Sequence, residues 1–117
     1  MTIRDAIERA DRIRPNVVHE DDKRLELYKI EAQIAEMMEQ DIPEWTDAEE
    51  NYELLLPDPY SQVYPLSLCV HIDYVQEETG LYQIDMITAN QAMREAQAWY
   101  RRNNQEVNDT RFTGVFI

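Results

Sequence analysis

The sequence has few of the side chains from which most enzymatic and metal sites are built. It contains one cysteine, Cys69, and two histidines, His19 and His71, among 117 residues. A single cysteine excludes an internal disulfide and a cysteine-based zinc site, so we expect Cys69 to be a small, buried core residue. His71 and Asp73 are two residues apart, so on a helix their side chains point to different faces and cannot bind one metal ion together. We expect His71 to be an ordinary helix residue.

Glycine and long apolar runs are also scarce. The two glycines, Gly80 and Gly114, are isolated, so the sequence has no glycine-rich loop that could cradle a phosphate. No apolar run approaches the roughly 18 residues that would span a bilayer. The first residues, MTIRDAIERADRIR, alternate charges with isoleucines, where a secretory signal would be apolar without interruption. We therefore expect a soluble protein with no membrane segment and no export by that route.

Positive charge is missing from the middle of the chain. No lysine or arginine lies between Ile30 and Met93, whereas this span holds more than half of the 24 acidic residues and accounts for the net charge of -13. Acidic surfaces repel phosphates, so this region is unsuited to direct DNA binding. It is either a solvated face that keeps the protein soluble or a surface that binds a partner, and the sequence leaves both open.

Apolar periodicity predicts an all-α fold, a small bundle of about four helices in a single domain over residues 1–117. Thr2, with Asp5 three residues later, has the pattern of a capping box and predicts a short first helix that stops at Pro15. A second helix is predicted from about residue 21 to 40, and the last from about 81 to 102.

The prolines after Tyr52 predict the entry to the third helix. In the stretch LLLPDPY, Asp58 suits an N-cap. Pro59 suits the first helical position, because an N–H at that position would make no hydrogen bond within the helix. Pro65 cannot donate to the carbonyl of Ser61, so we expect a kink or a detached first turn.

Two segments lack a helical pattern and are candidates for protein contacts. A long connection runs from residue 41 to 57, and loops of this length are usually functional or bound to a partner. The tail TRFTGVFI predicts a short C-terminal β-strand or extended tail, which could pair with another subunit. The alternative is that both segments simply cover the core and bind no partner, and the sequence favours neither. The candidate interface residues are Trp45, Phe112, Val115, Phe116 and Ile117.

The best enzymatic lead is a pair of acids, Glu36 and Glu39, spaced to share one helical face and followed by Glu50 and Glu53. All-α nucleotide pyrophosphatases hold magnesium with paired carboxylates of this kind. Here the second pair falls in the irregular segment before Pro57, and no basic group for a phosphate lies near either pair. We keep this as a minor hypothesis and expect no catalytic residue.

Two stretches resemble the small helical head-tail connector proteins, also called head-completion or adaptor proteins, of tailed phages and Gram-positive prophages. They are MTIRDAIERADRIRPN at the start, and LLLPDPYSQVY with the downstream HIDY. The similarity covers most of residues 1–80 in outline. Its sharpest part is a Pro-acid-Pro-Tyr helix entry that the family shares. In this sequence the helix-entry motif is Pro57, Asp58, Pro59 and Tyr60.

The resemblance implies a structural, non-catalytic protein that docks as a ring under the portal and links the capsid to the tail. It implies self-association, a portal partner and a tail-side or stopper partner, with DNA passing through the ring without sequence-specific binding. It implies no metal, cofactor or membrane, and a location in the host cytoplasm during assembly and then at the head-tail interface of the virion. The alternative from another class is an acidic DNA-mimic inhibitor of a DNA-binding protein, with carboxylates in a phosphate-like double row.

Overall fold

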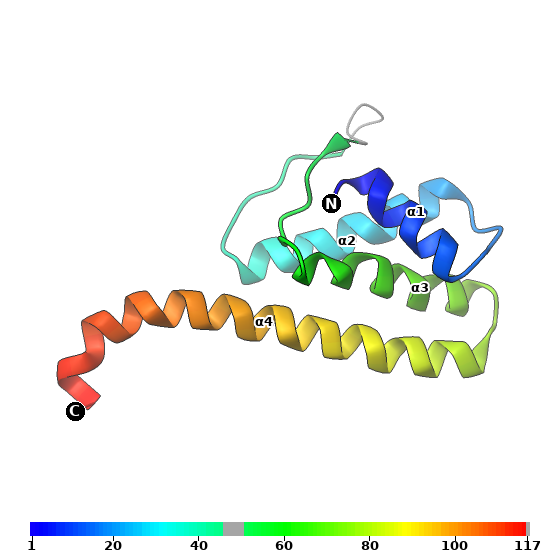
Figure 1. The fold of residues 1–117 in the computed structure, drawn as a ribbon. Coiled ribbons are helices and arrows are strands. Elements are labelled where there is room, and N and C mark those ends of the chain that lie inside the picture. The colour runs from blue at the N-terminus through cyan, green and yellow to red at the C-terminus, as the bar shows by residue number, and fades with distance from the viewer. Residues whose placement is uncertain (46–50, 117) are drawn as a thin grey trace.

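The computed structural model describes residues 1–45 and 51–116, with the side chains described up to residue 104. Within these residues the only β pairing is one antiparallel bridge between Thr2 and Glu53, which confirms the all-α prediction. The helices shown in Figure 1 are α1 (Ile3–Ile13), α2 (Glu20–Met37), the short 3₁₀ helix η2 (Tyr60–Gln62), α3 (Val63–Val75) and α4 (Thr79–Phe116).

Helix α1 begins as the sequence predicts. The N–H of Asp5 donates to the Thr2 hydroxyl at 3.1 Å, and the N–H of Thr2 donates to the Asp5 carboxylate at 3.1 Å. This reciprocal pair satisfies two N–H groups that would otherwise lack an acceptor at the helix start. The buried side of α1 consists of Ile3, Ala6, Ile7 and Ala10.

Helix α2 begins close to the predicted position, with a cap that the sequence did not indicate. The ring nitrogen Nδ1 of His19 accepts the N–H of Asp21 at 3.1 Å. The helix ends at Met37, and Glu39 just beyond it has a φ of 54°, a left-handed conformation that cannot continue the helix. Its buried residues are Lys23, Leu27, Ile30, Glu31, Ile34 and Ala35.

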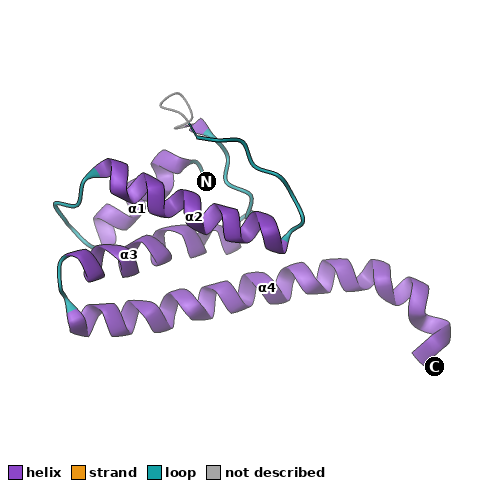
Figure 2. Ribbon diagram, turned by 180° about the vertical axis from the view of Figure 1, so that it is seen from behind, coloured by secondary structure: helices purple, strands orange, loops and turns teal. Residues whose placement is uncertain are grey.

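Helix α3 is the central member of the bundle. It contacts α1 and α2 on one side and α4 on the other, an arrangement visible from both directions in Figures 1 and 2. This explains why α3 is apolar around most of its circumference. Cys69 is 1% exposed and its thiol faces the carbonyl of Ala10 at 3.9 Å. The prediction of a small, buried core residue is thus confirmed, and burial raises the pKa of Cys69 to about 12.

The entry to α3 has neither the predicted cap nor a detached turn. Pro65 is the third residue of α3, where its missing N–H has no intrahelical acceptor to lose, and the 3₁₀ turn η2 runs directly into α3, because Gln62 and Val63 both have right-handed helical backbone angles. The start of α3 is thereby moved to Val63, beyond the reach of the Asp58 side chain. Asp58 instead accepts the hydroxyl of Ser61, within the turn.

The end of the chain differs from the sequence prediction. Helix α4 continues to Phe116, where a β-strand or extended tail was expected. Among the described residues there is no strand with which this tail could pair, whereas a continued helix satisfies its own backbone hydrogen bonds. In Figure 1, α4 runs past the other helices toward the C-terminus. The side chains of Phe112, Val115 and Phe116, and all of Ile117, lie outside the described part.

Candidate protein-interaction surface

A buried carboxylate anchors the segment that leads into α3. Glu31, on α2, is 0% exposed and accepts hydrogen bonds from the hydroxyl of Tyr64 at 2.6 Å and from the N–H of Leu55 at 2.9 Å, together with one from the side chain of Tyr52. The same Tyr64 hydroxyl accepts the N–H of Leu56 at 3.0 Å. Two consecutive backbone N–H groups of the LLLPDPY stretch are therefore held by side chains from two different helices.

This network was not predicted from the sequence. Burial raises the pKa of Glu31, and the hydrogen bonds from Tyr64 and Leu55 act in the opposite direction. Burial and the adjacent Glu31 carboxylate raise the pKa of the Tyr64 hydroxyl, which therefore remains a donor at all ordinary pH values. A signal was present, because Glu31 lies between Leu27 and Ile34 on the apolar face of its helix.

Residues 52–54 of the connection between α2 and η2 are held by the first residues of the chain. The N–H of Ile3 donates to the carbonyl of Tyr52 at 3.3 Å, and the N–H of Leu54 donates to the carbonyl of Met1 at 2.9 Å. The terminal ammonium of Met1 lies 3.1 Å from the carboxylate of Glu53. The described end of the loop is thus fixed both to the start of α1 and, through Glu31, to α2.

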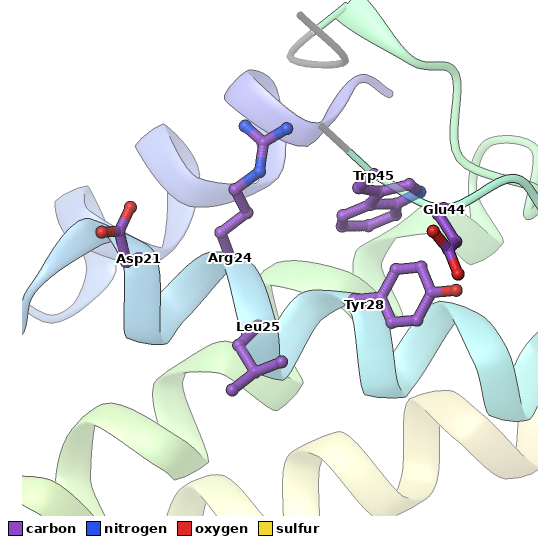
Figure 3. A pocket seen from close by; sticks show the side chains of 6 residues that line it. All are labelled: Asp21, Arg24, Leu25, Tyr28, Glu44 and Trp45. Carbon is purple, nitrogen blue, oxygen red and sulfur yellow. The ribbon is translucent and has the colours of Figure 1, made fainter. Parts of the chain in front are cut away.

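Trp45 lies in a surface groove between α2 and this connection, shown in Figure 3. Its indole ring meets the ring of Tyr28 edge-on at 5.0 Å and lies 5.6 Å from the ring of Tyr52. Leu25, on the same side of α2, is 56% exposed. The groove has a volume of about 440 Å³ and is lined by Asp21, Arg24, Leu25, Tyr28, Glu44 and Trp45.

The groove has the composition of a protein contact. The indole nitrogen of Trp45 is buried and has no hydrogen-bond acceptor among the described residues. Buried indole N–H groups normally find an acceptor. Tryptophan, tyrosine and arginine are also the residues most enriched at the centres of interfaces. Of the five predicted interface residues, Trp45 is the one whose side chain the structure describes.

The paired acids of the enzymatic hypothesis are not brought together. Glu36 is exposed on the last turn of α2 and Glu39 is exposed just beyond it. Glu53 faces the Met1 ammonium, and Glu50 lies outside the described residues. In the described ranges, no group of three or more His, Cys, Asp or Glu side chains is placed to hold a metal ion.

His71 faces α2 from α3. Its Nδ1 atom lies 3.8 Å from the carboxylate of Glu26, and its Nε2 atom has no hydrogen-bond partner within the described residues. His71 therefore lies at the contact between α2 and α3, whereas the sequence predicted only an ordinary helix residue.

None of the helices within residues 1–45 and 51–116 is both long and apolar enough to cross a bilayer. Comparisons of the chain with protein-family models, with curated proteins and with solved structures gave no match. The groove around Trp45 is therefore the candidate site on the strength of its own geometry.

Proposed function

We propose that this protein is a non-catalytic virion assembly protein, a head-tail connector that docks as a ring under the portal and links the capsid to the tail. Its partners are the portal protein, a tail-side or stopper protein and further copies of itself, and DNA passes through the ring. In this proposal the protein acts in the host cytoplasm during assembly and at the head-tail interface of the virion.

The observation that carries the proposal is the position of the helix-entry motif. Pro57 to Tyr60, on which the resemblance to connector proteins rests, directly follows the two backbone N–H groups held by Glu31 and Tyr64. Tyr60 then stacks on Trp99 of α4 at 5.0 Å. The motif thus connects the anchored residues Leu55 and Leu56 to the long helix α4. The residues held in this way, Leu55 and Leu56, give the motif a fixed base, which suits a contact element of a ring. The Trp45 groove lies open at the surface.

The charge distribution also supports the proposal. The segment between Ile30 and Met93, which has no basic residue, includes α3 and its connections to α2 and α4. An acidic surface facing a DNA channel would repel the duplex and let it slide without binding. The basic residues lie on either side of this segment, and Arg94, Arg101 and Arg102 among them are exposed on α4, where they can meet acidic surfaces of neighbouring proteins.

Replacing Trp45 with alanine is expected to weaken binding to the portal by more than tenfold, because central aromatic anchors carry most of the energy of an interface. Leu25→Ala, which removes an exposed side chain of the same groove, should weaken binding less and leave the fold intact. Binding is measured by interferometry on immobilised portal protein from the same phage or prophage genome.

The matched control is Ile87→Ala on α4, because Ile87 is 68% exposed and lies outside the groove. It should bind the portal as the unmodified protein does. Equal binding by the unmodified protein, Trp45→Ala and Leu25→Ala would show that the groove is not the portal contact.

A further inference from the structure

Three charged side chains from three helices meet where α1, α3 and α4 come together. Arg14, the C-cap of α1, donates two hydrogen bonds from its guanidinium group to the carboxylate of Asp85 on α4, at 2.9 and 2.8 Å. Its Nε atom also lies 3.6 Å from the carboxylate of Asp73 on α3. Asp73 is 1% exposed and Asp85 is 9% exposed. One guanidinium group therefore serves two buried carboxylates, and the fully ionised cluster carries one uncompensated negative charge.

A proton on Asp73 removes this excess charge. Protonated Asp73 hydrogen-bonds to the carboxylate of Asp85, so the two acids and Arg14 form one connected cluster without net charge. When Asp73 releases its proton to the solvent, this hydrogen bond is lost and two like charges face one another inside the protein. The ionised cluster is stabilised if water reaches Asp73.

The other titratable groups around the cluster cannot supply the missing positive charge. They come from α1, α3 and the turn after α3, and they are Asp11, Cys69 and Glu78. The Cys69 thiol is neutral because its pKa is raised to about 12, and the other two groups are acids. Asp11 already accepts a hydrogen bond from the ammonium group of Lys23 on α2, at 2.8 Å. Arg14 is thus the one cation that the structure gives to Asp73.

The first part of α4 has little apolar packing to hold it in place. In residues 79–95, the only buried side chains are those of Asp85 and Ala89, and all others are partly buried or exposed. The two isoleucines of this part, Ile84 and Ile87, are 59% and 68% exposed. Since an alanine buries little apolar area, the ion pair with Arg14 is a principal contact between this part and the rest of the protein.

The later part of α4 is held by contacts that do not involve the cluster. Ala96 is 0% exposed, and the ring of Trp99 stacks on that of Tyr60 at 5.0 Å. The hydroxyl of Tyr100 donates to the carbonyl of Met38 at 3.1 Å. The turn before α4, in contrast, is exposed at each of residues 77–80. The start of α4 can therefore detach while its later part stays in place.

We propose that Arg14, Asp73 and Asp85 form a proton-controlled latch. While Asp73 is protonated, the latch holds residues 79–88 of α4 against α1 and α3, and when Asp73 ionises these residues detach and fray. Fraying follows because the end of a helix is marginal in water without tertiary contacts. The latch goes beyond the connector role and does not depend on it.

The latch changes state near neutral pH. Burial, and then the neighbouring Asp85, raise the pKa of Asp73 to about 7, so the closed form prevails below this pH and the open form gains above it. Loss of the same proton also lowers the stability of the whole chain. The latch predicts, in addition, a local opening of the first part of α4 in a protein that is otherwise folded.

Amide hydrogen exchange tests the latch. The exchange rates of residues 83–88 are compared at pH 6 and pH 8, each divided by the rate of an unfolded peptide of the same sequence. We expect their protection to fall about tenfold at pH 8 and to be insensitive to low urea, because a local opening exposes little surface. Amides of α3 should be better protected and should respond to urea. Unchanged protection of residues 83–88, or exchange that follows urea as in α3, would overturn the proposal.

Variants assign the opening to the cluster. Asp73→Asn leaves Arg14 with Asp85 alone, so residues 83–88 should be as well protected at pH 8 as at pH 6. Arg14→Gln removes the cation, so these residues should exchange rapidly already at pH 6, with circular dichroism reporting whether the remaining helices are kept. Glu8→Gln, an exposed acid on α1, is the matched control and should show the same fall as the unmodified protein. An undiminished fall in Asp73→Asn would contradict the latch, whatever the fold of Arg14→Gln.

Discussion

Replacing Tyr64 with alanine is expected to lower the free energy of unfolding by about 3–5 kcal/mol, the usual cost of truncating a buried aromatic side chain. Tyr64 is 0% exposed at the centre of the bundle. Its loss would also leave Glu31 and the N–H of Leu56 without their partner inside the protein. Since small domains are stable by about 5–15 kcal/mol, this single change should remove a large share of the stability of the protein.

Tyr64→Phe removes the hydroxyl and keeps the ring, so it measures the contribution of the hydroxyl to stability by itself. The ring still fills its place, but the Glu31 oxygen and the Leu56 N–H lose a hydrogen bond, at an expected cost of roughly 1–3 kcal/mol. Urea unfolding followed by circular dichroism measures both variants. Tyr74→Phe is the control, because Tyr74 is largely exposed and should unfold as the unmodified protein does. A Tyr64→Phe protein as stable as the unmodified one would mean that the hydroxyl does not anchor the loop.

The second large effect is a fall in stability as the pH rises. Burial, and then the neighbouring Asp85 carboxylate, raise the pKa of Asp73 from 3.8 to about 7 in the folded protein, while Arg14 opposes this shift. The charged groups around Asp73 are Arg14 from the end of α1, Asp85 from α4 and Glu78 from the turn. On α3 itself the Cys69 thiol, with its raised pKa, remains neutral.

The direction follows from which state binds the proton. Between about pH 4 and pH 7 the folded protein holds a proton on Asp73 that the unfolded chain has released, so stability falls as pH rises through this window. For one proton the slope is at most about 1.4 kcal/mol per pH unit. The raised pKa of Glu31 acts in the same direction. Urea midpoints should therefore decrease from pH 5 to about pH 7 and level off toward pH 8.

Asp73→Asn tests the origin of this effect. Asparagine keeps the shape of the side chain but cannot ionise, so the variant should be more stable than the unmodified protein at pH 8 and should lose most of the slope. Glu8→Gln on α1 should retain the full slope. If Asp73→Asn unfolds with the unchanged pH dependence, Asp73 is not the group that titrates.

Features of this protein that depend only on neighbouring residues could be predicted from the sequence. The capping box of Thr2 and Asp5 follows from side chains within a few residues of each other. The contacts that define the sites, in contrast, join residues that are far apart in the sequence. Glu31 and Tyr64 are separated by 33 residues and Arg14 and Asp85 by 71, and no local pattern specifies which distant partner a buried acid will find.

The C-terminal prediction failed for a related reason. The residues from Thr110 onward favour a strand by composition, but strand preference depends on a neighbouring strand with which to pair. Helix α4 needs no such neighbour and continues through this segment to Phe116. For the candidate site, the sequence indicated Trp45 through the length of its loop, while the groove formed with Tyr28 and Leu25 required the fold.

The most direct measurement is light scattering on a sizing column, for the protein alone and mixed with the assembled portal protein from the same phage or prophage genome. We predict that the mixture elutes as one complex whose mass exceeds that of the portal by several copies of the 13.9 kDa chain. Separate elution of the two proteins at micromolar concentration, with the portal properly assembled, would contradict the proposal that this protein is a head-tail connector.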